Sequence, residues 1–205
     1  MKEIIRQKLI IFTRYPEPGN TKTRLIPALG PDGAADFQKR MTESIFQEIK
    51  QVVVRQGVEV DVYYEGGDDN SMRQWLGPEV SYFPQRGGDI GERMNHAFHE
   101  AFDSGAEQVV IIGTDCPSLT DEIVSNAFDK LESHDLVLGP ALDGGYYLIG
   151  LNRPINKLFE GISWGSGIVR EQTKSIAKNL WLQVYEVDIL VDIDRPEDII
   201  YFQTS

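Results

Sequence analysis

The stretch Gln108–Leu119, QVVIIGTDCPSL, decides the fold that this sequence predicts. Its first six residues form a strand pattern that, after Gln108, is apolar on both faces of an extended chain, which is typical of a strand in the middle of a helix-covered parallel sheet. Asp115 stands just after this strand, at its carboxyl end. Ligands of open α/β sheets bind at the carboxyl ends of the strands, so we expect Asp115 to lie in a functional site.

Segments with strand and helix patterns alternate on both sides of this central stretch. Short apolar runs indicate strands, and apolar residues that recur every three or four positions indicate helices. The predicted strands cover residues 9–12, 59–64, 80–83, 108–113, 136–138, 146–151 and 181–187, and the predicted helices cover 36–54, 68–76, 89–104, 121–133, 167–179 and 196–202. This order predicts an α/β fold, a three-layer α/β/α sandwich with a mainly parallel sheet. The length suits one domain over residues 1–205.

The charge, the apolar runs and the cysteine content of the chain argue against several classes of protein. The formal net charge is −12, which argues against nucleic-acid binding, where a basic surface is expected. No apolar run reaches the roughly 18–20 residues that a membrane span requires. The apolar run near the basic N-terminus is too short for a signal peptide, so we expect a cytoplasmic protein. The single cysteine, Cys116, excludes an internal disulfide and is expected to fill space in the core.

A cationic loop stiffened by prolines follows the first predicted strand. The loop RYPEPGNTKTRL, residues 14–25, carries Arg14, Lys22 and Arg24. A guanidinium can grip a phosphate through two hydrogen bonds, and a lysine supplies a point charge. Gly19 allows the backbone to approach a ligand closely. The loop matches neither the Walker pattern nor the dinucleotide fingerprint, and an exposed loop of solvated cations explains its composition equally well.

Two aspartates near the C-terminus are candidate partners for Asp115. In VDIDRPEDI, residues 191–199, Asp192 and Asp194 alternate with apolar residues and therefore project from one face of an extended segment. Magnesium and manganese prefer carboxylate oxygens and accept substrate phosphates as further ligands. A metal site requires one of these two aspartates beside Asp115. The alternative is that Asp194 caps the helix that Pro196 opens.

Three glycine-rich stretches have both a functional and a structural interpretation. PQRGGDIGERM, residues 84–94, suits close backbone contact with a base or sugar, although Asp89 can also cap the next helix. In GPALDGGYYLIGL, residues 139–151, Asp143-Gly144-Gly145 also suits a hairpin turn. Trp164 in ISWGSG, residues 162–167, either walls a pocket or packs in the core.

Taken in order, these stretches resemble the nucleotide-diphospho-sugar transferase superfamily, which has the GT-A fold. The carrying motifs are RYPEPGNTKTRL, QRGGDIGERM, GTDCPSL, DGGYYLIG and WGS, and they span almost the whole chain. The resemblance is strongest to the bacterial radical-SAM/selenodomain-associated glycosyltransferases. Phospholactate guanylyltransferases and molybdenum-cofactor nucleotidyltransferases are more distantly similar.

The resemblance implies a nucleotide site over the first strand and a divalent metal, Mg²⁺ or Mn²⁺. It implies that Asp115 holds the metal, and the closing pattern DRPED favours Asp194 as its partner, with Asp192 as the rival. The implied catalytic residues are Lys22, Arg24 and Asp115. The implied nucleotide-binding residues are Arg14, Pro18, Gly19, Lys22, Arg24, Gln85, Gly88, Asp89 and Thr114, and the implied substrate-binding residues are Asp143, Gly144, Gly145, Trp164 and Ser166.

The function expected on these grounds is a metal-dependent transferase that uses a nucleotide-activated substrate. It would be a glycosyltransferase, or alternatively a nucleotidyltransferase that acts on a phosphate or carboxylate acceptor and releases pyrophosphate. The chain has Thr114-Asp115-Cys116 where many glycosyltransferases have D-x-D, which weakens the case for glycosyl transfer. Its end soon after residue 202 favours a small-molecule acceptor. A nucleotide-binding protein without turnover is the alternative of another class, and the sequence indicates neither the base, the sugar nor the oligomeric state.

Overall fold

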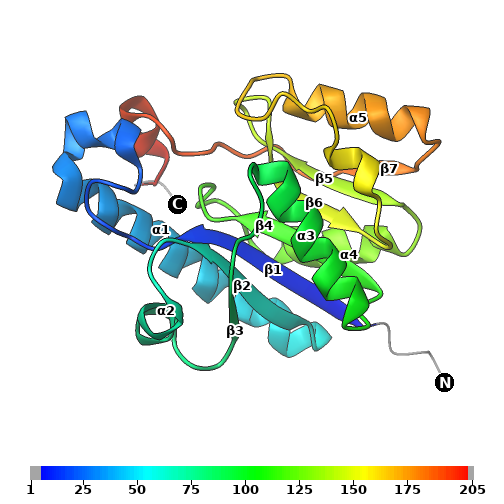
Figure 1. Cartoon of the computed structure of the whole chain (residues 1–205), viewed down its shortest axis with the longest axis horizontal. Coiled ribbons are helices and arrows are strands. Elements are labelled where there is room, and N and C mark those ends of the chain that lie inside the picture. Colours follow the sequence, from blue (N-terminus) through cyan, green and yellow to red (C-terminus); the bar gives the residue numbers. More distant parts are fainter. Residues whose placement is uncertain (1–5, 203–205) are drawn as a thin grey trace.

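The computed structural model describes residues 6–202, and its centre is one seven-stranded sheet (Figure 1). The strands stand in the order β3-β2-β1-β4-β6-β5-β7. They cover β1 Gln7–Arg14, β2 Glu59–Glu65, β3 Ser81–Pro84, β4 Gln108–Gly113, β5 Leu136–Pro140, β6 Tyr146–Leu151 and β7 Val184–Glu186. Only β6 runs antiparallel to its neighbours β4 and β5, while the other pairings are parallel. The mainly parallel sheet is therefore confirmed.

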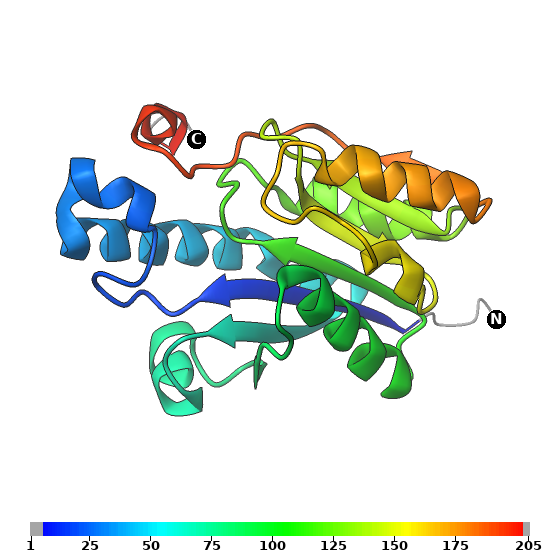
Figure 2. The same cartoon turned by 45° about the horizontal axis from the view of Figure 1, so that its top comes forward.

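Helices cover both faces of this sheet. They are α1 Ile26–Gln56, α2 Asp69–Leu76, α3 Ile90–Asp103, α4 Asp121–Leu131 and α5 Val169–Asn179, with the 3-10 helices η1 Thr23–Leu25, η2 Asn156–Phe159 and η3 Pro196–Phe202. One apolar core packs α1, α2 and α4 against the sheet, and a second packs α3, α5 and η2 against its other face. Figure 2 shows α3 across the sheet from α1. The predicted three-layer sandwich is confirmed.

Strand β1 explains why two cores form. Leu9 and Ile11 belong to the first core, and Ile10 and Phe12 belong to the second, because successive side chains of a strand point to opposite faces. In the parallel ladder with β4, Phe12 pairs with Gly113. The two central strands thus end side by side, and the residues that follow them share one edge of the sheet.

Helix α1 begins ten residues before the predicted start at residue 36. Gly30 breaks it with φ 71° and ψ 169°, and Pro31 follows, so the helix consists of two parts across a kink. These breaks also interrupt the apolar periodicity on which the prediction relied. The early part packs with Ile193 and Phe202 in a third apolar cluster, which brings η3 beside the start of α1 in both views (Figures 1 and 2).

The C-terminal quarter departs most from the prediction. Of the predicted strand 181–187, only the part that makes up β7 is extended. Trp181 lies in an exposed turn with φ 59° instead. The predicted terminal helix is the 3-10 helix η3. Between them, residues 187–195 form no strand, although Leu190 makes an isolated bridge to Ala141. Among residues 6–202, no helix is long and apolar enough to cross a membrane.

The predicted hairpin turn at Asp143-Gly144-Gly145 joins β5 to β6. Ala141 N donates to Gly145 O at 3.1 Å, and Gly145 N donates to Asp143 Oδ1 at 2.7 Å. Gly144 has φ 91°, and a Cβ built there would lie 2.1 Å from the carbonyl oxygen of Gly167. The turn therefore packs backbone to backbone against the loop before α5.

We predict that Gly144→Ala destabilises the fold more than Gly161→Ala does. Both glycines have positive φ, but a Cβ at Gly161 meets nothing within 4 Å. Strained backbone alone costs about 1–3 kcal/mol, so Gly161→Ala should stay in that range while Gly144→Ala exceeds it because backbone must also move. Chemical denaturation measures both values. Equal losses of unfolding free energy in the two variants would show that close packing of the turn against Gly167 adds nothing to the cost of Gly144→Ala.

Candidate functional site

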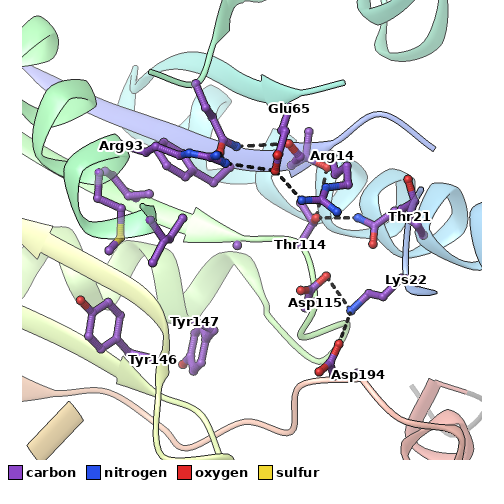
Figure 3. A pocket seen from close by; sticks show the side chains of 18 of the residues that line it. Arg14, Thr21, Lys22, Glu65, Arg93, Thr114, Asp115, Tyr146, Tyr147 and Asp194 are labelled. Carbon is purple, nitrogen blue, oxygen red and sulfur yellow. Dashed lines mark hydrogen bonds and ion pairs between the residues drawn. The ribbon is translucent and has the colours of Figure 1, made fainter. Parts of the chain in front are cut away.

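A cavity of about 590 Å³ opens at the edge where β1 and β4 end (Figure 3). Its size is typical of small-molecule sites. Residues from the loop after β1, from the start of α3, from β6 and from the C-terminal segment line it. The predicted site residues that line it are Arg14, Lys22, Arg24, Gln85, Thr114, Asp115 and Asp194.

Lys22 is the most buried cation of this cavity. Its side chain is 5% exposed, and its Nζ lies 3.0 Å from Asp115 Oδ1 and 4.0 Å from Asp194 Oδ1. The same ammonium donates a hydrogen bond to the carbonyl oxygen of Ile193. Its backbone adopts the left-handed conformation, with φ 48°, just before η1. The cationic loop thus turns inward and places an ammonium between two of the predicted metal ligands (Figure 3).

Asp115 and Asp194 come from distant parts of the chain. Asp115 follows β4, and Ile193 N donates to its carbonyl oxygen at 2.8 Å. Ile193 is fully buried in the third cluster, which fixes the C-terminal segment against the end of β4. Arg24, whose side chain is 66% exposed, pairs with the Asp194 carboxylate. Asp198 accepts hydrogen bonds from Asp194 N and Arg195 N, so Asp198 caps the start of η3.

Asp192 and Asp143 add negative charge beside this pair. Burial, and then the charges of Asp143, Asp115 and Asp194, raise the pKa of Asp192 above its ordinary value. The raised pKa means that the folded protein holds the ionised form of Asp192 at a cost. A bound cation would offset the repulsion among these four carboxylates.

Asp115 and Asp194 fit a divalent cation that substrate oxygens also coordinate. They already share one cation, the Lys22 ammonium. Within residues 6–202, no group of three or more His, Cys, Asp or Glu side chains is arranged to hold a metal by itself. Magnesium commonly binds through one or two carboxylates together with phosphate oxygens. The donor set is therefore suited to a metal that arrives with a phosphorylated ligand.

An ion-pair chain lines the opposite side of the cavity. Glu65 lies 2.5 Å from Arg14 Nη2 and 3.1 Å from Arg93 Nη1. Burial alone would raise the pKa of Glu65, but the hydrogen bonds and charges of the two arginines lower it. Gln85 donates to the carbonyl oxygens of Thr13 and Tyr63, which fixes the loop after β3 to the ends of β1 and β2.

A buried hydroxyl network forms the floor between the two sides. Thr13 Oγ1 lies 3.2 Å from both Thr42 Oγ1 and Thr114 Oγ1, and Gln38 donates to Thr114 at 3.0 Å. These bonds join α1 to the ends of β1 and β4. Cys116 is buried next to this region, and burial, followed by the charge of Asp115, raises the pKa of its thiol. The thiol therefore stays protonated, as expected for a core residue.

The other predicted site residues lie outside the cavity lining. They are Pro18, Gly19, Gly88, Asp89, Asp143, Gly144, Gly145, Trp164, Ser166 and Asp192. Asp89 caps α3 by accepting from Glu92 N, and Glu92 in turn accepts from the backbone N–H of Gly88, the residue before the cap. Trp164 packs edge-on against Tyr146, and a Cβ at Gly91 would meet its ring at 2.3 Å. These contacts give Asp89 and Trp164 structural roles.

Several lining residues were not singled out from the sequence. Glu65, Arg93, Gln38, Thr21, Tyr146 and Tyr147 all border the cavity. Thr21, Arg93 and the two tyrosines lie within the motifs quoted above, and their place in those motifs is the sequence signal that could have found them. Glu65 ends β2, and only the parallel pairing of β2 with β1 indicates that it faces the site.

Two proteins described as transferases are similar to this chain. A crystal structure from Desulfovibrio desulfuricans G20, provisionally described as a nucleotide-diphospho-sugar transferase, is 33% identical, with a TM-score of 0.89 over 98% of this chain and 88% of that one. A 2-phospho-L-lactate guanylyltransferase from Methanocaldococcus infernus is 23% identical over 187 residues, which are 88% of this chain and 77% of the relative.

A third relative shares the fold at a greater distance. Glucosyl-3-phosphoglycerate synthase from Mycobacterium tuberculosis, solved in complex with Mn²⁺, UDP and glucosyl-3-phosphoglycerate, is 15% identical, with a TM-score of 0.57 over 96% of this chain and 75% of that one. The Desulfovibrio structure, at 33% identity, confirms the resemblance to nucleotide-diphospho-sugar transferases, while the radical-SAM association stays a prediction. A family model described as "Uncharacterized protein conserved in bacteria (DUF2064)" matches residues 48–166, and the chain belongs to this family.

Proposed function

We propose that this protein is a metal-dependent transferase that acts on a nucleotide-activated substrate. One observation carries the proposal: the cavity at the ends of β1 and β4 holds Lys22 against Asp115 and Asp194. Cations that can bind phosphates and carboxylates that can hold a metal thus meet at the ligand-binding edge of the sheet. The names of the relatives, a nucleotide-diphospho-sugar transferase and a guanylyltransferase, support the same class.

The residues of the cavity divide into three tasks under this proposal. Lys22, Arg24 and Arg14 bind the phosphates, because guanidinium and ammonium groups supply the charge-assisted hydrogen bonds that phosphate oxygens accept. Gln85, Glu65 and Arg93 border the nucleoside, with Gly88 and Asp89 shaping their loop. Asp115 and Asp194 hold Mg²⁺ or Mn²⁺, with Asp192 as the rival ligand. The Mn²⁺ in the glucosyl-3-phosphoglycerate synthase complex supports a divalent metal.

Two chemistries fit this arrangement. In glycosyl transfer, an acceptor oxygen attacks the anomeric carbon of a nucleotide-sugar and a nucleoside diphosphate leaves. In nucleotidyl transfer, an acceptor phosphate or carboxylate attacks the α-phosphorus of a nucleoside triphosphate and pyrophosphate leaves. Both leaving groups gain negative charge, which Lys22 and Arg24 are placed to stabilise. When bound, the metal would neutralise charge on the phosphate oxygens.

The acceptor is proposed to be a small molecule that binds on the β6 side of the cavity. Tyr146 and Tyr147 line that side, and the turn at Asp143-Gly144-Gly145 precedes them. Trp164 and Ser166 belong to the loop that packs against this turn through Gly167. We further propose that residues 1–205 form one transferase domain and that the protein is cytoplasmic.

The experiment that tests the proposal is a thermal-shift screen with metal. Nucleoside triphosphates, diphosphates and nucleotide-sugars are each added with Mg²⁺, with Mn²⁺ or with EDTA. A ligand at about a hundred times its dissociation constant adds roughly 2.7 kcal/mol of stability, which is easily observed. We expect a metal-dependent rise of the melting temperature for at least one nucleotide class.

The pattern of responses separates the two chemistries. A response to triphosphates, followed by pyrophosphate release with an acceptor, indicates nucleotidyl transfer, and a response limited to one nucleotide-sugar indicates glycosyl transfer. No response to any nucleotide, with or without metal, would contradict the proposed function.

We predict that Asp115→Asn abolishes the metal-dependent part of nucleotide binding. The amide still accepts a hydrogen bond from Lys22, so the fold should persist, but it lacks the charge that a divalent cation requires. Asp188→Asn is the matched control, because Asp188 is exposed and does not line the cavity. Calorimetric titration of both variants with nucleotide plus Mn²⁺ measures the effect. Unchanged metal dependence in Asp115→Asn would remove Asp115 from the metal site.

We predict that Asp192→Asn stabilises the protein in EDTA at neutral pH. The pKa of Asp192 is raised in the folded state, so the ionised carboxylate opposes folding above its unfolded value of about 3.9. The gain should be present near pH 7, should shrink as the pH falls through the raised pKa of the folded state, and should vanish below about pH 3, where both states are protonated. Denaturation midpoints across this pH range measure it. A gain that persists in full at about pH 3 would exclude the charge of Asp192 as its cause.

A further inference from the structure

The Lys22 ammonium is enclosed by the same oxygens that the proposed metal would use. Three groups surround it: the Asp115 carboxylate, the Asp194 carboxylate and the carbonyl oxygen of Ile193. At 5% exposure the side chain has little contact with water. The Asp115 side chain is 52% exposed, but its partner ammonium is not, so a divalent cation at Asp115 Oδ1 would repel a poorly solvated like charge at short range.

The other cations of the cavity are placed differently. Arg24 also pairs with Asp194, but it is mostly exposed, so water can solvate it if the pair opens. Arg14 is held by Glu65 and by the carbonyl oxygen of Asn20. Among the cavity cations, Lys22 alone is both buried and in contact with Asp115 within the described residues. Lys22 is therefore the cation that a metal must compete with.

We propose that Lys22 couples metal binding to nucleotide binding. Its ammonium is the counter-ion of Asp115 and Asp194, and it gives up Asp115 when the phosphates of a nucleotide offer it another anion. The metal alone then binds weakly, because it takes the carboxylates and leaves the Lys22 ammonium without an anionic partner. The metal and the phosphates together bind strongly, because each anion keeps one cation. This inference rests on the proposed function and adds that the metal and the nucleotide each bind more tightly when the other is present.

The loop that carries Lys22 fits this exchange. Lys22 follows the buried Thr21, whose hydroxyl donates to Tyr15 O at 2.8 Å, and precedes the exposed Thr23 and Arg24. Lys22, Thr23 and Arg24 all line the cavity where phosphates are proposed to bind. Rotation of the lysine side chain alone can thus move its charge from the carboxylates towards the phosphates, without displacement of the backbone.

We predict that Lys22→Met strengthens binding of Mn²⁺ alone by about tenfold or more and lowers the coupling to phosphate. Mn²⁺ affinity is measured by titration calorimetry on the full chain, without and with inorganic pyrophosphate, at matched free Mn²⁺. In the wild type, pyrophosphate should raise Mn²⁺ affinity by a factor within the range of about 5–150 that is usual for coupled sites. In Lys22→Met this factor should fall towards one.

Arg14→Met is the control for loss of charge. It removes one positive charge from the same cavity, but Arg14 contacts Glu65 rather than the aspartates. It should change affinity for Mn²⁺ alone much less than Lys22→Met does. Lys22→Gln serves as a second variant if the methionine variant does not fold, since its amide can still donate to Ile193 O.

The outcomes distinguish this inference from the proposed function. If the wild type binds Mn²⁺ and Lys22→Met binds it equally or more weakly, the coupling role of Lys22 is wrong while the metal site stands. The same conclusion follows if Arg14→Met strengthens Mn²⁺ binding as much as Lys22→Met. If neither wild type nor variant binds Mn²⁺, even with pyrophosphate, the metal-dependent function and this inference both fail.

Discussion

The contact between the buried Lys22 ammonium and the partly exposed carboxylates of Asp115 and Asp194 is the interaction on which the site depends. It joins three segments that are far apart in the sequence: the loop after β1, the turn after β4 and the C-terminal segment. The ammonium is the buried member of this contact, so loss of both carboxylates would leave it without a counter-ion, which is costly. The same contact gathers the cations and the carboxylates of the cavity, so the organisation of the fold and the proposed chemistry share one set of residues.

The sheet explains how these segments meet. Parallel pairing of β1 with β4 brings Thr13 and Thr114 together at one edge. The C-terminal segment reaches that edge because Ile193 is buried in the third cluster and bonds to the backbone of Asp115. Phe202 packs edge-to-face on Phe37 of α1 and holds the end of η3. Asp194 is thus placed by apolar packing on both of its sides rather than by a strand, which leaves its carboxylate free to bind cations.

Much of the fold could be predicted from the sequence, because local patterns determine it. Strands β4 and β6 have their predicted bounds, and Asp89 caps α3 as expected. The predictions missed the start of α1, where Gly30 and Pro31 interrupt the periodicity, and most of 181–187, where Trp181 has a positive φ. For the site, Lys22, Asp115 and Asp194 could be proposed from motifs. The bridging role of Glu65 could not, because it depends on the spatial proximity of Arg14 and Arg93.

The most direct test of the account is a crystal structure of the protein with Mn²⁺ and the nucleotide that stabilises it most, recorded at a wavelength where manganese scatters anomalously. We expect an anomalous peak between the carboxylates of Asp115 and Asp194, phosphates over the loop that carries Lys22 and Arg24, and the Lys22 ammonium turned from Asp115 towards the phosphates. A manganese peak or a nucleotide outside this cavity would contradict the account.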